Sequence, residues 1–165
     1  MQLLAENPNV LFLGQSVAYP GNAIYKTLEN IPLEKRLELP VMEEAQMGIS
    51  IGLSLEGFIP VSIFPRFDFL LLAMNQLVNH LDKIWEMSDG QYSPKVIIRT
   101  AVGSIKPLYP GPQHCQDHTI AFRLLLENIN VIKLEYAEDI VPAYVKALQD
   151  RKSSLIIEKA DLYYE

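Results

Sequence analysis

The sequence of 165 residues has a single cysteine, Cys115, and only three histidines. One thiol cannot form an intramolecular disulfide, and these four residues lack the spacing of metal ligands, so we expect no metal site built by this chain alone. A reducing, cytoplasmic compartment is therefore the expected location. The longest apolar runs are far shorter than the ~20 residues of a membrane-spanning helix. The N-terminus also lacks the basic region and the apolar run of a secretory signal.

Positive charge is scarce as well. The formal net charge is −6 and the isoelectric point is near 5.1. Nucleic acids and anionic lipids both require clustered Lys and Arg, so the sequence favours neither as a partner. With 49% hydrophobic and 21% charged residues, the chain has the size and balance of one globular domain spanning residues 1–165.

Strand and helix signals alternate along the chain. Short apolar or β-branched runs, the first three of them next to Gly or Pro, predict six strands, at 10–13, 36–39, 58–64, 95–100, 131–134 and 153–158. Helical spacing or capping residues predict helices at 23–29, 43–55, 70–85, 117–126 and 138–149. The helix at 70–85 has the clearest apolar stripe. This alternation predicts an α/β fold: a single three-layer domain with a mostly parallel sheet flanked by helices.

In an open parallel sheet, ligands bind at the carboxyl ends of the strands. This rule brings together Gln15, Glu43, the turn at 65–69 and the loop at 103–117. These segments are therefore expected to hold the residues that carry chemistry.

Glu43 and Glu44 follow Pro40 at the start of a helix that also carries Gly48 and Gly52. Acids in a first helical turn are common because the free amides and the helix dipole favour them. Neighbours on a helix point about 100° apart, so only one of the two acids can face a ligand. Each mid-helix glycine costs about 1 kcal/mol relative to alanine, which is consistent either with tight packing inside the fold or with a close subunit contact.

The segment Phe64-Pro-Arg-Phe-Asp-Phe69 places three aromatic rings and an arginine at the ligand-binding edge. The rings are consistent with ordinary core packing or with a stacking surface for a ligand. Arg66 could grip an anionic substrate group or pair with an acid such as Asp68.

Two of the three histidines lie in the loop Tyr109-Pro-Gly-Pro-Gln-His-Cys-Gln-Asp-His118. A histidine can transfer protons near neutral pH, which makes His114 a candidate catalytic residue, whereas His118 is consistent with a structural role. Sequence adjacency alone does not make Cys115 a nucleophile activated by His114. The chain also has no glycine-rich phosphate cradle and no Gly-Asp-Gly followed by Asn that could hold a magnesium diphosphate.

Taken in order, these segments resemble the pyrimidine-binding domain of thiamine-diphosphate-dependent 2-oxoacid dehydrogenase beta subunits and, more distantly, of transketolase. The resemblance runs from Val10-Leu-Phe-Leu-Gly14 to Ile156-Ile-Glu-Lys159. Its most specific part is Glu43, with four residues before Gly48 and then Gly52, which resembles the family's catalytic glutamate leading a glycine-bearing interface helix. The aromatic turn and the segment Gly111-Pro-Gln-His-Cys-Gln116 resemble two further family motifs.

The resemblance implies a role for each candidate residue. Glu43 would hydrogen-bond a ring nitrogen of the cofactor's aminopyrimidine and, with His114, would be catalytic. The other implied cofactor contacts are Phe69, Phe67 and Gln15; the implied substrate contacts are His114, Arg66 and Gln113; and the implied interface residues are Gly48 and Gly52. The chain departs from the family at Gln15, where an acid is usual, and at Arg66, where an uncharged residue is common.

The resemblance also implies a function that needs a second chain. The cofactor would be thiamine diphosphate, with its magnesium held by a diphosphate-binding, alpha-like partner subunit, because the sequence has no counterpart of the family's C-terminal domain or of its diphosphate motif. The expected assembly is a hetero-oligomer with self-contact through the 43–55 helix. The expected reaction is decarboxylation of a 2-oxoacid or transfer of an acyl or ketol unit. The alternatives are a transketolase-like transferase subunit and a non-catalytic regulatory or scaffolding subunit.

Overall fold

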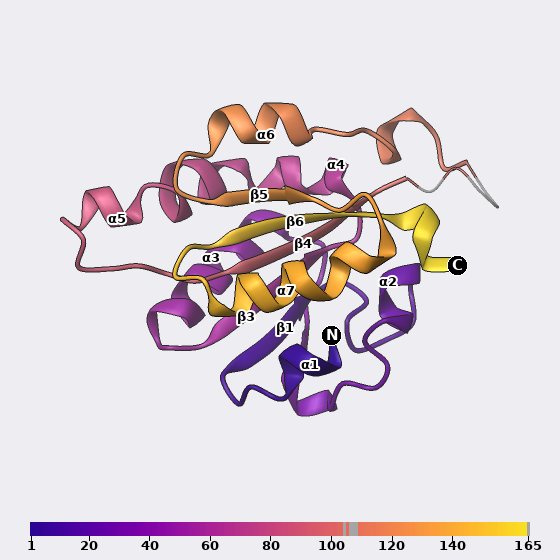
Figure 1. Ribbon diagram of the computed structural model, residues 1–165, viewed down its shortest axis with the longest axis horizontal. Helices are drawn as coiled ribbons and strands as arrows, with labels where there is room; N and C mark the ends of the chain where they lie inside the picture. The colour runs from indigo at the N-terminus through magenta and orange to yellow at the C-terminus, as the bar shows by residue number, and fades with distance from the viewer. Residues whose placement is uncertain (104, 106–108, 165) are drawn as a thin grey trace.

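The computed structural model describes residues 1–103, 105 and 109–164, and its centre is a six-stranded parallel sheet (Figure 1). The strand order is β2-β1-β3-β4-β6-β5, and every neighbouring pair is parallel. The strands are β1 (Val10–Gly14), β2 (Arg36–Glu38), β3 (Ile59–Phe64), β4 (Ile97–Val102), β5 (Asn130–Lys133) and β6 (Ser154–Lys159). The expected sheet is confirmed, and each strand lies within two residues of its predicted bounds.

Helices cover both faces of this sheet. On one face lie α1 (Gln2–Ala5), α2 (Ala23–Lys26) and α7 (Ile140–Gln149). On the other lie α3 (Glu43–Leu55), α4 (Phe67–Leu70), the segment 71–81 and α6 (Thr119–Leu125). Short 3₁₀ turns η1 (Leu33–Lys35), η4 (Pro112–His114), η5 (Ala137–Asp139) and η6 (Ala160–Tyr164) join these elements. Figure 1 shows α7 across one face of the sheet and α6 on the outer side of the other layer.

The sheet separates two hydrophobic cores. One core includes Phe12 and Tyr144, and the other includes Phe64 and Phe122. Successive residues of a strand point to opposite faces, so Ile97 and Ile98 of β4 enter different cores. Burial on both faces explains why the strands read as continuous apolar runs. The prediction of a three-layer α/β domain is confirmed.

The prediction of one long helix over 70–85 is wrong. The segment consists of α4, the 3₁₀ turn η2 (Leu71–Ala73), a π-helical stretch η3 (Asn75–Leu81) and α5 (Ile84–Met87). Leu70, Ala73, Leu77 and Leu81 are buried hydrophobic residues of this segment, and they enter the same core despite the changes in hydrogen bonding. Apolar spacing predicts the buried face, but it does not distinguish i→i+4 closure from i→i+5 closure.

The strand order changes direction between β1 and β3, because β1 pairs with β2 on one side and with β3 on the other. Connections leaving such neighbouring strands diverge and open a crevice at their carboxyl ends. Gln15 directly follows β1, and the turn with Arg66 follows β3. This switch point therefore defines where a site is expected.

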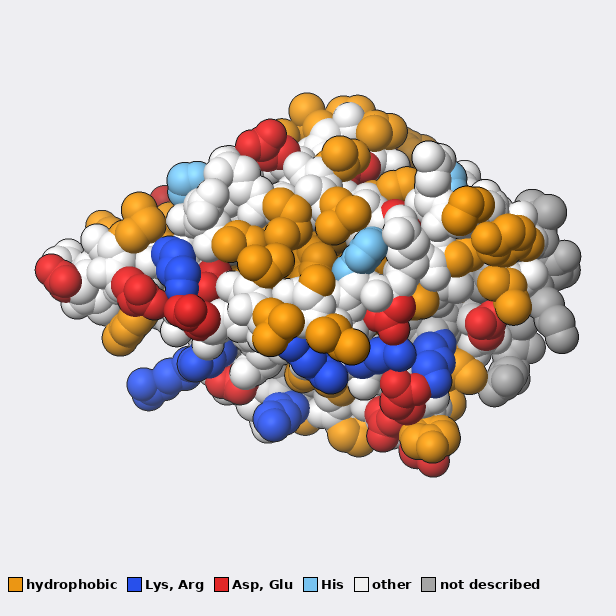
Figure 2. Space-filling model, turned by 90° about the horizontal axis from the view of Figure 1, so that it is seen from above, with side chains coloured by type: hydrophobic (Ala, Val, Ile, Leu, Met, Phe, Trp, Pro, Cys, Tyr) orange, Lys and Arg blue, Asp and Glu red, His pale blue; other side chains and the backbone are white. Residues whose placement is uncertain are grey.

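The outer side of α6 carries exposed hydrophobic side chains. Ile120 and Leu124 are 74% and 80% exposed, and Leu125 is 45% exposed. Figure 2, which views the molecule from the side of α6, shows hydrophobic side chains gathered on this face. Contiguous exposed apolar groups often mark interaction surfaces. Among the helices that the structure describes, none is long and apolar enough to cross a membrane.

Candidate functional site

Glu43 is the first residue of α3, and its side chain is buried at the carboxyl edge of the sheet, with 6% exposure. Gln15 Nε2 donates to Glu43 Oε1 at 3.2 Å. Among the described residues, Gln15 is the one side chain that hydrogen-bonds this carboxylate. The structure thus joins two residues that lie 28 positions apart and that the sequence placed at the same edge.

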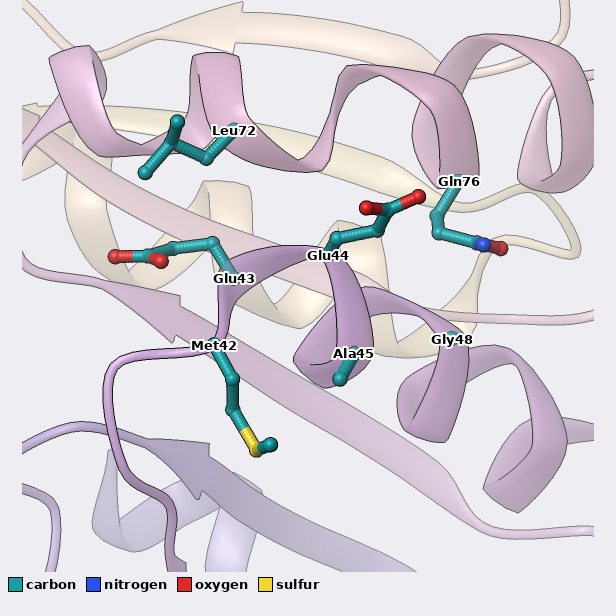
Figure 3. A pocket seen from close by; sticks show the side chains of 7 residues that line it. All are labelled: Met42, Glu43, Glu44, Ala45, Gly48, Leu72 and Gln76. Carbon is teal, nitrogen blue, oxygen red and sulfur yellow. The ribbon is translucent and has the colours of Figure 1, made fainter.

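Glu44 points elsewhere. Its side chain is exposed, and its Oε1 accepts a long hydrogen bond from Asn75 Nδ2 at 3.4 Å. Figure 3 shows the two carboxylates diverging, with that of Glu44 toward Gln76 and that of Glu43 away from it. Both acids border an open pocket of about 520 Å³ between α3 and the segment that carries Leu72 and Gln76. Of the two acids, only Glu43 combines burial with a position beside Gln15.

Gln46 anchors the start of α3 to the sheet. Its buried Nε2 donates to Ser62 Oγ at 3.1 Å and to the Ile63 carbonyl at 3.0 Å. Gly14 permits this approach, because a Cβ at its position would lie 2.3 Å from the Ile63 carbonyl oxygen. Gln46 is not among the site residues predicted from the sequence. Its signal is a polar residue one turn after Glu43 on the side of α3 that faces the sheet.

Glu38 shapes the turn that carries Gln15. Its carboxylate accepts backbone N–H hydrogen bonds from Ser16, Val17 and Ala18 at 2.6, 2.8 and 2.7 Å. Ser16 has φ +55°, a left-handed conformation that a non-glycine residue rarely adopts without such support. Glu38 therefore fixes the backbone beside Gln15. No local sequence pattern indicates this role, because the donors lie about 20 residues away.

The aromatic turn supplies one ring to the site and another to the core. Phe69 is half-buried, and its ring meets His114 edge-on, with centroids 5.6 Å apart. Phe67 is fully buried and packs on Phe122 and His118, with centroids 4.8 and 5.5 Å apart. In this structure the ring of Phe67 belongs to the core beneath the turn, and its expected contact with the cofactor stays a prediction.

The loop at 103–117, which we call the histidine loop, contacts the aromatic turn at 64–69 through its described residues. Arg66 Nη1 donates to the carbonyls of Gly103 and His114 at 2.9 and 2.8 Å. Gln116 Nε2 donates to Asp68 Oδ1 at 2.8 Å. The alternative prediction is an ion pair between Arg66 and Asp68. No salt bridge joins these two residues in the part of the chain that the structure describes. Gln113 is exposed on the loop.

The loop ends at Asp117, which accepts from the backbone N–H of Thr119, the first residue of α6. Helix α6 therefore begins two residues later than predicted. Burial of Asp117 opposes ionisation, but hydrogen bonds from Thr119 and Lys133 outweigh it and lower the pKa of Asp117 to about 2. The carboxylate is thus held ionised at the end of the loop.

The glycines of α3 face open space. A Cβ at Gly52 would meet no atom within 4 Å, and one at Gly48 would meet only the Gln76 side chain, at 3.8 Å. Tight packing inside the fold, one of the two readings of these glycines, is therefore wrong. Within the part of the chain that the structure describes, no group of three or more His, Cys, Asp or Glu residues could hold a metal ion.

Two solved transketolase structures share the fold of this chain. A split-gene transketolase solved as an inactive beta4 tetramer superposes with a TM-score of 0.73 at 20% identity, covering 96% of this chain and 47% of that one. A transketolase from Campylobacter jejuni superposes with a TM-score of 0.70 at 20% identity, over 94% of this chain and 23% of that one. The fold is therefore that of a transketolase-like domain.

Sequence similarity then narrows the relationship. The chain is 27% identical over 163 residues to the mitochondrial pyruvate dehydrogenase E1 beta subunit of Chaetomium thermophilum, covering 97% of this chain and 42% of the relative. It is 28% identical to the beta-2 subunit of Oryza sativa and 24% identical to the beta subunit of Rickettsia bellii, over 98% and 97% of this chain and 43% and 49% of those relatives. No protein-family model matches the chain. The chain thus has a transketolase-like fold and is similar in sequence to E1 beta subunits, and it spans less than half the length of these relatives.

Proposed function

We propose that this chain is the pyrimidine-binding part of a thiamine-diphosphate enzyme that acts on a 2-oxoacid or a ketose. The observation that carries the proposal is the buried carboxylate of Glu43 at the first residue of α3, beside the switch point of the sheet. A carboxyl group sheltered from water can exchange a proton with a ring nitrogen that is brought against it. Similarity to E1 beta subunits over nearly the whole chain supports this reading.

The residues present fit the pyrimidine end of the cofactor. Glu43 offers one carboxylate with a single described side-chain partner, Gln15, and Phe69 offers a half-buried ring for an aromatic group. The diphosphate end has no matching cluster of acids among the residues described. We therefore assign the magnesium diphosphate to a partner chain.

When bound, thiamine diphosphate supplies the nucleophilic carbon that attacks the substrate carbonyl. In this proposal Glu43 holds a proton against a ring nitrogen of the aminopyrimidine, and Gln15 orients the carboxylate through Oε1. Phe69 packs against the ring. His114, whose imidazole lies edge-on to Phe69, faces the substrate and moves or holds a proton there.

The partner we propose is a diphosphate-binding, alpha-like subunit, together with a second copy of this chain that contacts α3. Two observations support these contacts: the open space at Gly48 and Gly52 and the exposed apolar face of α6. The structural neighbour solved as an inactive beta4 tetramer comes from a split-gene transketolase, which supports the division of such an enzyme between chains. The proposed substrate is a small molecule rather than a nucleic acid or a membrane, and cytoplasmic location stays a prediction.

A transketolase-like two-carbon transferase is the second candidate, favoured by the structural similarity to two transketolases. A non-catalytic regulatory or scaffolding subunit is the third. The enzyme readings both require Glu43, whereas a scaffold does not. One substitution therefore separates catalysis from scaffolding, and the choice of pyruvate or a ketose phosphate as substrate separates the two enzymes.

The test is Glu43→Gln in the enzyme reconstituted with its diphosphate-binding chain. The amide preserves shape but cannot exchange the proton, so turnover should fall by about 10²- to 10⁴-fold. The matched control is Glu44→Gln, because Glu44 is the exposed neighbour on the same helical turn, and it should retain wild-type turnover. A Glu43→Gln enzyme with undiminished turnover would contradict the proposal and favour the scaffold.

A further inference from the structure

Arg66 bridges two described residues of the histidine loop, Gly103 and His114. It precedes α4, and its Nη1 donates to the carbonyl of Gly103, just after β4, and to the carbonyl of His114, at the end of η4. The two acceptors are 11 residues apart in sequence, yet both lie within 2.9 Å of one nitrogen. The guanidinium thus holds the backbone of His114 close to Gly103 at the end of β4.

Two neighbours of Arg66 hold the same loop. Asp68 accepts from Gln116 Nε2 at 2.8 Å, and the ring of Phe69 lies edge-on to that of His114. Three residues of the aromatic turn, Arg66, Asp68 and Phe69, therefore contact the loop. Arg66 differs from the other two, because it holds the backbone of His114 itself and the start of the loop at once.

The chemistry of this contact is specific to arginine. A guanidinium presents several N–H donors in a fixed plane and stays charged, and hydrogen bonds from a charged donor are stronger than neutral ones. Lysine has a flexible point charge that can reach a carbonyl with weaker directional control. A neutral apolar side chain of similar length supplies neither bond.

We propose that Arg66 is a positioning residue, which ties the backbone of His114 to Gly103 and thereby places His114 against Phe69, and that it does not itself bind the substrate. This inference rests on the proposed function only for the importance of His114. The loop contact itself concerns the chain alone and can be tested without cofactor or partner.

The first experiment is hydrogen–deuterium exchange on the free chain, comparing wild type, Arg66→Met and Arg66→Lys. The reporter is the loop around the His114 amide, which donates to the Gly111 carbonyl at 3.2 Å. Losing two charge-assisted bonds should speed exchange in peptides covering 109–118 by at least about tenfold in Arg66→Met, with partial recovery in Arg66→Lys. The matched control is Arg123→Met on the exposed face of α6, which should exchange like wild type.

Two exchange results would overturn the inference. One is wild-type exchange of the loop in Arg66→Met. The other concerns a variant that is destabilised as a whole. If Arg66→Met loses protection in the sheet as well as in the loop, Arg66→Lys is the deciding variant. Faster exchange spread evenly through Arg66→Lys would then also reject a local role. Faster exchange confined to the loop of Arg66→Lys supports it.

The second experiment separates positioning from substrate binding in the reconstituted enzyme, with pyruvate and an artificial electron acceptor as the assay. A misplaced catalytic group lowers kcat, by about 100-fold for a shift near 1 Å, and leaves KM for pyruvate nearly unchanged. Direct recognition of the pyruvate carboxylate by Arg66 would instead raise KM in Arg66→Met with kcat retained, and would refute the inference. If Glu43→Gln keeps wild-type turnover, the proposed function fails, while the exchange result still decides the role of Arg66 in the loop.

Discussion

Arg99 and Glu158 form a buried ion pair between the adjacent strands β4 and β6. Arg99 Nε and Nη2 donate to the two carboxylate oxygens at 3.0 and 2.8 Å, and the hydroxyls of Tyr144 and Tyr163 also donate to Glu158. Burial alone would raise the pKa of Glu158, but the charge of Arg99 and these hydrogen bonds outweigh it and lower this pKa. The pair connects the sheet to α7 and to the C-terminal turn η6.

Glu158→Gln should destabilise the fold strongly. The substitution leaves the Arg99 guanidinium buried without its counter-charge, which costs about 3 to 5 kcal/mol. Because folding lowers the pKa of Glu158, its contribution is present above the ordinary value of 4.5 and is lost as pH falls through the folded value. The stability difference between wild type and variant, measured by urea unfolding at several pH values, should therefore shrink in acid.

The control for this substitution is Glu127→Gln, since Glu127 is an exposed acid paired with Lys83 at the surface. Surface substitutions of this kind change stability by about 0.5 kcal/mol or less. Equal effects of the two substitutions would show that the Arg99–Glu158 pair is not important for stability.

At the scale of elements, α3 combines a buried polar start with an exposed glycine stripe. Gly52→Ala should stabilise the isolated fold by up to about 1 kcal/mol, because alanine is the better helix former and its Cβ meets nothing within 4 Å. The same methyl group should weaken self-association if a second copy packs against α3. Urea unfolding and sedimentation velocity measure the two effects.

Gly57→Ala is the matched comparison for Gly52→Ala. A Cβ at Gly57 also meets nothing within 4 Å, but its φ of +90° lies in a region that L-residues avoid. This substitution should therefore destabilise the fold by about 1 to 2 kcal/mol. The change in unfolding free energy is thus opposite in sign to that of Gly52→Ala, although both sites have room for the methyl group. If Gly52→Ala were destabilising and left association unchanged, α3 would not be the contact surface.

The elements that sequence predicted best are those whose signal is local. The six strands are marked by short apolar runs, as in β1 between Pro8 and Gly14, and all six are confirmed. The π-helical stretch was missed because its buried residues keep near-helical spacing. The roles of Glu38 and Gln46 were missed because they depend on partners brought close only by the strand order. Sequence thus placed Gln15 and Glu43 at one edge, whereas their hydrogen bond required the fold.

At the scale of the whole molecule, the candidate site is open at the carboxyl edge, and apolar surface remains exposed on α6. A cofactor bound only through its pyrimidine end makes few charged contacts with this chain. Its diphosphate and magnesium carry most of the charge and need acids that the described residues do not bring together. Binding energy is therefore expected to come from two chains.

We accordingly expect this chain alone to bind thiamine diphosphate weakly and independently of magnesium. Once a diphosphate-binding chain is present, binding should depend on magnesium and be at least about 100-fold tighter, a difference of about 2.8 kcal/mol in binding free energy. The partner can be sought by co-purification, and isothermal titration can then compare each chain alone with the mixture. Leu124→Glu tests whether α6 contacts the partner chain. If it does, a charge on the exposed face of α6 should weaken assembly without changing the free energy of unfolding. Tight magnesium-dependent binding by this chain alone would refute the division of the cofactor between two chains, since one polypeptide would then hold both of its ends.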